Sequence, residues 1–153
     1  MRAWQVHQHG KPHDALRLVD IESPAPGPGE VRLRVHAAAL GMPDAFMCMG
    51  NYALTPPLPF VAGQEVCGTV VDVGEGVDPS VTPGTRLMGV TCFNFGKGGF
   101  AEETVARADS LHRVPDAMPD VDAAGFRIGY STAWIGLVRR GRLQPGEHLL
   151  VLG

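Results

Sequence analysis

Hydrophobic and polar side chains alternate most regularly between residues 31 and 37. Apolar side chains occupy every second position of this stretch: Val31, Leu33, Val35 and Ala37. The positions between them are polar: Arg32, Arg34 and His36. Because successive side chains of a strand point to opposite faces, this alternation predicts a half-buried strand whose polar face, with His36, meets solvent.

A second strand is predicted in the glycine-punctuated stretch 63–77, around which the rest of the chain is organised. Its apolar run, 66–73, is rich in valine, a β-branched residue that suits a pleated, half-buried strand. Gly74 and Gly76 follow directly and predict a tight turn. Gly68 interrupts the run, and a glycine inside a strand pattern indicates a bulge or a close approach of another backbone.

Short apolar stretches between turn residues predict further strands. They cover residues 2–7, 16–21, 86–90, 100–108 and 111–114. Pro43 opens a predicted short helix, 43–49, since proline is tolerated in the first turn of a helix. The 20 glycines and 13 prolines favour short strands joined by many turns over a helical bundle. The predicted fold class is therefore mainly β (α+β).

The pattern changes to a helical one after residue 120. Asp120 or Asp122 caps a predicted helix that runs to about Arg140. Its apolar positions recur at a spacing of about 3.6 residues: Ala124, Ile128, Ile135 and Val138. Three glycines weaken this helix by up to ~1 kcal/mol each relative to alanine: Gly125, Gly129 and Gly136.

An apolar strand is predicted at 148–152, directly ahead of Gly153. A buried strand followed by glycine is typical of the start of a dinucleotide-binding βαβ unit. We therefore expect residues 1–120 to form one domain. Residues 121–153 then form a hinge helix and the start of a second domain, whose remainder is absent from this sequence.

Composition and charge exclude several classes of function. A net charge of −3 provides no basic surface for nucleic acid or an anionic membrane. No apolar run approaches the ~20 residues that cross a bilayer, and the first ten residues contain no apolar signal core. The three cysteines are far apart, so we expect free thiols and a reducing, cytoplasmic location.

Several segments, in order, resemble motifs of one known family. Residues 63–70 (GQEVCGTV) look like its G-H-E-x-x-G-x-V motif, and residues 38–44 (AALGMPD) look like A-A-L-N-F-P-D. Residues 59–65 are similar to its P-F-x-x-G-x-E motif, and residues 83–89 are similar to P-G-D-R-V-x-G. Residues 98–102 match a strand-opening motif of the same family. Nearly the whole chain thus resembles the N-terminal GroES-like domain of medium-chain dehydrogenases/reductases, in the zinc-independent, zeta-crystallin-like quinone reductase branch.

The resemblance implies a GroES-like, partly open barrel, followed by a C-terminal helix and the first strand of a truncated Rossmann domain. Zinc members of the family bind the catalytic metal at the positions of Gly41 and Gln64. Glycine has no ligand atom, and a neutral amide is a poor ligand for zinc. We therefore expect no metal site. Glu65, beside them, either hydrogen-bonds within the fold or acts in acid–base chemistry.

The resemblance further implies hydride transfer from NADPH to a small-molecule quinone or enone. Tyr52 matches a tyrosine of the quinone reductases, and its hydroxyl is the candidate catalytic donor to a carbonyl oxygen. Aromatic side chains are expected to form the substrate wall together with Tyr52: Phe46, Phe93 and Phe95. Phe46 stands where many members have tyrosine. The alternative interpretation places these aromatic rings in the core.

Four residues are expected beside the cofactor: Gly41, Met42, Thr132 and Gly153. Gly41 replaces the usual asparagine, and Met42 either flanks the cofactor or fills a gap in the core. Thr132 matches a threonine that faces the nicotinamide, although a helical hydroxyl also bonds back to the preceding turn. Asp44 is expected to orient neighbouring backbone or to cap the short helix.

Two other functions remain open at this stage. One is an enoyl-thioester reductase of the same family, and the other is a non-catalytic GroES-like interaction module. The resemblance also implies a homodimer for the full-length protein. This chain alone is expected to be inactive, because the cofactor is bound mainly by the missing domain.

Overall fold

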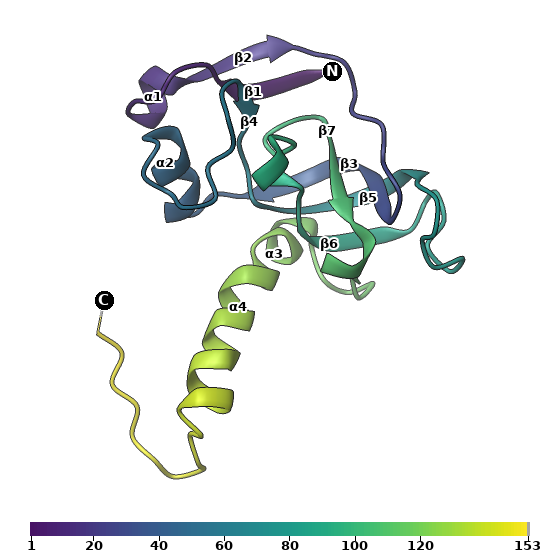
Figure 1. The fold of residues 1–153 in the computed structure, drawn as a ribbon. Helices are drawn as coiled ribbons and strands as arrows, with labels where there is room; N and C mark the ends of the chain where they lie inside the picture. Colours follow the sequence, from purple (N-terminus) through teal and green to yellow (C-terminus); the bar gives the residue numbers. More distant parts are fainter. Residues whose placement is uncertain (153) are drawn as a thin grey trace.

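The computed structural model describes residues 1–152, which form two antiparallel sheets with few helices (Figure 1). The three-stranded sheet has the order β2-β1-β4, with β1 at Arg2–Val6, β2 at Leu16–Asp20 and β4 at Phe60–Val61. The five-stranded sheet has the order β7-β3-β5-β6-β8. Its strands are β3 (Glu30–Ala39), β5 (Glu65–Val73), β6 (Arg86–Val90), β7 (Glu103–Arg107) and β8 (Leu111–Arg113). The sheets do not close into a complete barrel, so the predicted mainly β, partly open architecture is confirmed.

The two strands with the clearest sequence patterns, β3 and β5, are neighbours at the centre of the larger sheet. Their register shifts between Val35 and Ala37, where Val35 lies opposite Gly68. A Cβ atom on Gly68 would clash with the carbonyl oxygen of Arg34. The close backbone approach predicted at Gly68 is therefore confirmed, and only glycine fits there without a shift of the strand.

Three apolar clusters form the core. The first lies beneath the three-stranded sheet and includes Phe60 and Met47. The second packs on the five-stranded sheet around Leu33, and the third joins that sheet to the helix that follows it, through Met88 and Ala124. The inward residues of β3, Val31 and Leu33, are fully buried, as their alternation predicts.

The helices are short. Before residue 115 they are α1 (Pro12–Ala15), α2 (Met42–Cys48) and the 3-10 turns η1 (Phe93–Phe95) and η2 (Ala108–Ser110). The predicted continuous helix to Arg140 is wrong in one respect, because it breaks at Gly125, with φ −94° and ψ 5°. It forms α3 (Asp120–Ala124), α4 (Phe126–Trp134) and the π-helical η3 (Ile135–Arg140). Glycine is a poor residue for a helix interior, which is compatible with the break at Gly125, although Gly129 lies within α4 without a break.

The apolar stripe of this helix packs only at its start. Ala124 is buried, whereas Ile135 is 52% exposed. Figure 1 shows α4 projecting away from the two sheets, so its second half has no sheet beneath it. No helix within residues 1–152 combines the length and the apolar character that crossing a membrane requires.

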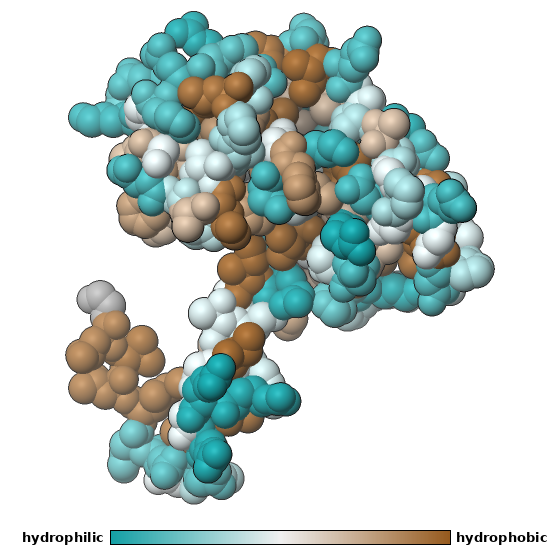
Figure 2. All heavy atoms as spheres, viewed as in Figure 1, coloured by the Kyte–Doolittle hydropathy of each residue, from teal (hydrophilic) through white to brown (hydrophobic). Residues whose placement is uncertain are grey.

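Residues 148–152 do not form the predicted strand. They lie in irregular chain after η3, and Figure 1 shows this segment away from both sheets. A strand needs a neighbouring strand with which to exchange backbone hydrogen bonds. No segment among residues 1–152 pairs with this one. Its side chains are left exposed, Leu150 by 80% and Leu152 by 85%. Figure 2 shows the segment near the C-terminus as mostly brown, hydrophobic spheres away from the main body.

Candidate functional site

Asp44 accepts hydrogen bonds from two segments that carry sequence motifs, residues 38–44 and residues 63–70. Gly41 is the N-cap of α2, and its amide donates to Oδ2 of Asp44 at 2.8 Å. Oδ1 of the same carboxylate accepts the amide of Gln64, on the other segment, at 3.1 Å. Burial raises the pKa of Asp44, and these backbone hydrogen bonds partly oppose that rise. The predicted structural role of Asp44 is confirmed.

Gln64 and Glu65 are both 5% exposed, and each is engaged within the fold. The Gln64 side-chain amide donates to Sδ of Met47 at 3.2 Å. Oε1 of Glu65 accepts the amide of Ile128, in the first turn of α4, at 2.9 Å. Burial raises the pKa of Glu65, while the hydrogen bonds from α4 lower it. Glu65 therefore hydrogen-bonds within the fold, as one of its two interpretations expected.

The predicted aromatic residues occupy different environments. Tyr52 and Phe93 lie together, with ring centroids 6.5 Å apart, and both pack on the first core cluster. Phe93 is only 7% exposed, which matches its alternative interpretation as a core residue. Phe46 on α2 is 39% exposed and Phe95 on η1 is 70% exposed, so neither ring is buried in the core. Tyr52 is half-buried, and its role as a donor stays a prediction.

The residues expected beside the cofactor lie on two helices. Met42, the first residue of α2, is 66% exposed and therefore does not fill a core gap. Thr132 is exposed on α4, one turn beyond Ile128. Gly153 lies outside the described residues.

The side chains at these positions carry no charge. Gly41 and Gln64 offer no good metal ligand, and the Gln64 amide already bonds Met47. Among residues 1–152 no three His, Cys, Asp or Glu side chains lie close enough to share a metal ion. Gly41 and Gln64 therefore do not supply the donor atoms that a zinc site requires.

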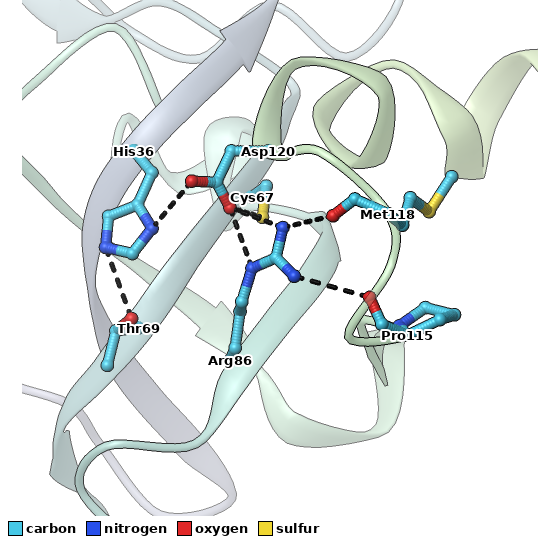
Figure 3. Close-up of polar contacts among 7 residues, drawn as sticks. All are labelled: His36, Cys67, Thr69, Arg86, Pro115, Met118 and Asp120. Atoms are coloured by element: carbon cyan, nitrogen blue, oxygen red, sulfur yellow. Dashed lines mark hydrogen bonds and ion pairs between the residues drawn. The ribbon is translucent and has the colours of Figure 1, made fainter.

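A polar cluster around Asp120 was not predicted from the sequence (Figure 3). Oδ1 of Asp120 accepts Nε of Arg86 at 2.7 Å and the thiol of Cys67 at 3.2 Å. Oδ2 lies 3.3 Å from Nδ1 of His36, whose Nε2 lies 3.2 Å from the hydroxyl of Thr69. The polar position of His36 in the alternation had indicated a solvated side chain. The structure instead places its ring between Asp120 and Thr69.

The electrostatics of this cluster favour an ionised Asp120. The hydrogen bond from Arg86, then that from Cys67, lower the pKa of Asp120. Two causes raise the pKa of Cys67 to about 12: burial is the larger, and the neighbouring carboxylate of Asp120 is the smaller. Arg86 also donates to the carbonyl oxygens of Met118 and Pro115, so it fixes the loop that leads into α3. The prediction that Asp120 or Asp122 caps the helix is wrong, because the N-cap of α3 is Pro119 and both aspartates lie inside its first turn.

Comparison with known proteins gives consistent matches. Residues 27–116 match the model of the alcohol dehydrogenase GroES-like domain. The chain is 35% identical over 159 aligned residues to quinone oxidoreductase-like protein 2 of Mus musculus, covering 98% of this chain and 43% of that protein. It is 36% identical to the mitochondrial enoyl-[acyl-carrier-protein] reductase of Xenopus tropicalis, covering 97% of this chain and 41% of that protein.

Solved structures agree with these sequence matches. The quinone oxidoreductase from Coxiella burnetii superimposes with a TM-score of 0.87 at 26% identity, covering 96% of this chain and 47% of that one. A mycobacterial protein determined in complex with NADPH gives a TM-score of 0.85 at 32% identity, with 96% and 44% coverage. The chain thus spans less than half the length of the relatives it matches.

Proposed function

Since this chain belongs to the alcohol dehydrogenase GroES-like domain family, we propose that it is the substrate-side part of an NADPH-dependent, zinc-independent oxidoreductase. The acceptor is a quinone or another activated alkene. Residues 1–120 form the substrate-side domain, and residues 121–153 lead into a dinucleotide-binding domain. We refer below to the chain continued through such a domain as the extended protein.

The contact of Asp44 with both motif segments carries this proposal. Its carboxylate brings Gly41 and Gln64 together, and zinc members of the family bind their catalytic metal at those two positions. Here neither side chain is a good zinc ligand. This geometry, combined with unsuitable ligands, supports a cofactor-driven reaction without metal.

The chain's own residues then bind and orient the reactants. Tyr52 donates a hydrogen bond to the carbonyl oxygen of the acceptor, and the exposed ring of Phe46 keeps water from the reacting atoms. Met42 and Thr132 flank the nicotinamide. NADPH, when bound, supplies the hydride, while the protein supplies position and electrostatics.

The Tyr52→Phe variant of the extended protein tests this role. Loss of a donor to a developing oxyanion lowers turnover by roughly 100-fold, measured as NADPH oxidation with a soluble quinone. Tyr130→Phe is the matched control, because it also removes one tyrosine hydroxyl. Tyr130 lies on α4, where its ring stacks on Phe126. Unchanged turnover in the Tyr52→Phe variant would remove that residue from the mechanism.

A second candidate is the reduction of an enoyl thioester. It is favoured by the 36% identity to an enoyl-[acyl-carrier-protein] reductase. Comparing kcat/KM for a quinone and for an enoyl thioester, with the same extended protein, decides between the two acceptors. A cytoplasmic homodimer belongs to the same proposal, and sedimentation of the extended protein tests its dimeric state.

A further inference from the structure

Besides the apolar packing of the third core cluster, two side-chain carboxylates attach the helices after residue 120 to the five-stranded sheet, one on each side of Gly125. The first contact is made by Asp120, the first residue of α3 (Figure 3). Its partners come from three adjacent strands, β3, β5 and β6: His36, Cys67 and Arg86. Asp120 therefore fixes the start of α3 against the face of the sheet.

The second contact is made by Glu65, at the start of β5. Its Oε1 accepts the amide of Ile128 at 2.9 Å. Amides in the first turn of a helix have no partner within the helix, and the positive end of the helix dipole lies there. A buried carboxylate is thus well suited to hold this end of α4, and Arg127 adds a favourable charge beside it.

Gly125 lies between the two contacts and interrupts the helix. α3 ends at this residue and α4 begins after it, so no continuous run of helical hydrogen bonds spans the joint. Asp120 lies on the α3 side of this joint, whereas Phe126 packs on the third core cluster and Glu65 holds the amide of Ile128 on the α4 side. The direction of α4 therefore depends on Glu65 together with this packing.

Thr132 is four residues beyond Ile128, which places it one helical turn further along the same side of α4. We propose that Glu65 is a positioning residue, which holds the amide of Ile128 and thereby sets the direction of α4 and the place of Thr132 beside the nicotinamide. Only the last step, the role of Thr132, rests on the proposed function.

Amide hydrogen exchange on the present chain tests the contact itself. Glu65→Ala removes the acceptor, and Ile128→Pro removes the donor at a position where the first turn tolerates proline. Each variant lowers the protection of the α4 amides by roughly 10- to 100-fold, while the paired amides of β5 and β6 keep theirs. The double variant loses no more than Glu65→Ala alone, because that variant already removes the acceptor of the Ile128 amide.

Glu102→Ala is the control, since it removes an exposed carboxylate that pairs with Arg2 instead. Unchanged protection of α4 in either variant, or additive losses in the double variant, overturns the proposal. If the Glu65→Ala chain loses the protection of its sheet, Ile128→Pro still decides, because it leaves the buried carboxylate in place.

Kinetics of the extended protein test the consequence. Glu65→Ala lowers kcat at least about tenfold with little change in the KM for the quinone, since misplacement affects the reaction more than substrate binding. Glu65→Gln keeps an acceptor oxygen and retains most of kcat. If Glu65→Ala keeps full kcat, Glu65 does not position Thr132. If the parent protein itself has no turnover, the proposed function fails, while hydrogen exchange still decides the role of Glu65.

Discussion

The thiol of Cys67 donates a hydrogen bond to Oδ1 of Asp120 at 3.2 Å, although 53 positions separate the two residues. This bond ties the centre of β5 to the first turn of α3. The same carboxylate binds Arg86, so the thiol lies beside an ionised acid and inside the core. Both features oppose formation of a thiolate.

The three cysteines are therefore expected to be unreactive in the folded chain. All three are buried, and burial followed by a neighbouring carboxylate raises the pKa of Cys67 to about 12 and that of Cys92 to about 11. At about pH 8 a disulfide reagent is expected to label fewer than about one thiol per native chain. In denaturant it should label all three, and rapid native labelling of Cys67 would contradict this account.

Gly68→Ala is expected to destabilise the chain strongly. Its Cβ atom meets the carbonyl oxygen of Arg34, a backbone atom that moves only if β3 and β5 separate. We expect a loss of about 3 kcal/mol or more in the free energy of unfolding, measured with urea. Gly76→Ala is the control, because Gly76 has φ +75° but open space around it, and its cost should stay near about 1–2 kcal/mol.

Glu65→Gln is expected to change how stability depends on pH. Burial raises the folded-state pKa of Glu65 above its unfolded value. The stability from this shift is fully present below the unfolded pKa and is lost as pH rises through the folded pKa. Relative to the parent, Glu65→Gln should therefore gain stability as pH rises above the ordinary glutamate pKa of about 4.5. Urea unfolding at a series of pH values above and below this point measures the change, and a parallel pH profile for the two proteins would argue against it.

Gly41→Asn is expected to be tolerated. Gly41 has φ −122°, which any residue adopts, and it is the N-cap of α2, where asparagine is among the preferred residues. Its nearest new contact is Cδ of Pro43 at 3.3 Å, so the free energy of unfolding should change by less than about 1 kcal/mol. In the extended protein, the added amide beside the nicotinamide should raise turnover with a quinone. Failure of the Gly41→Asn chain to fold would show that the geometry of α2 depends on glycine.

The sequence predicted the parts of the fold that depend on local pattern. Alternation in 31–37 located β3 and its buried face, and Gly68 marked the close approach of two backbones. The motif order also identified the family, which the domain match and the relatives confirm. These features were predictable because each is indicated by residues that lie close together in the sequence.

Features that depend on distant partners were not predictable. The contacts of Asp120 join three strands to a helix, and no spacing in the sequence indicates them. The 148–152 segment has the composition of a strand, yet it pairs with no strand among residues 1–152. Phe93 and Phe95 have the same chemistry and lie two positions apart, but only tertiary packing decides that the first is buried and the second exposed.

The most direct test of the central claim is calorimetric titration of NADPH into this chain and into the extended protein. The account predicts saturable binding by the extended protein and none by this chain alone, because the present residues contribute only the face toward the nicotinamide. Absence of binding by both proteins would contradict it. In that case a non-catalytic interaction module would be the better account of this fold.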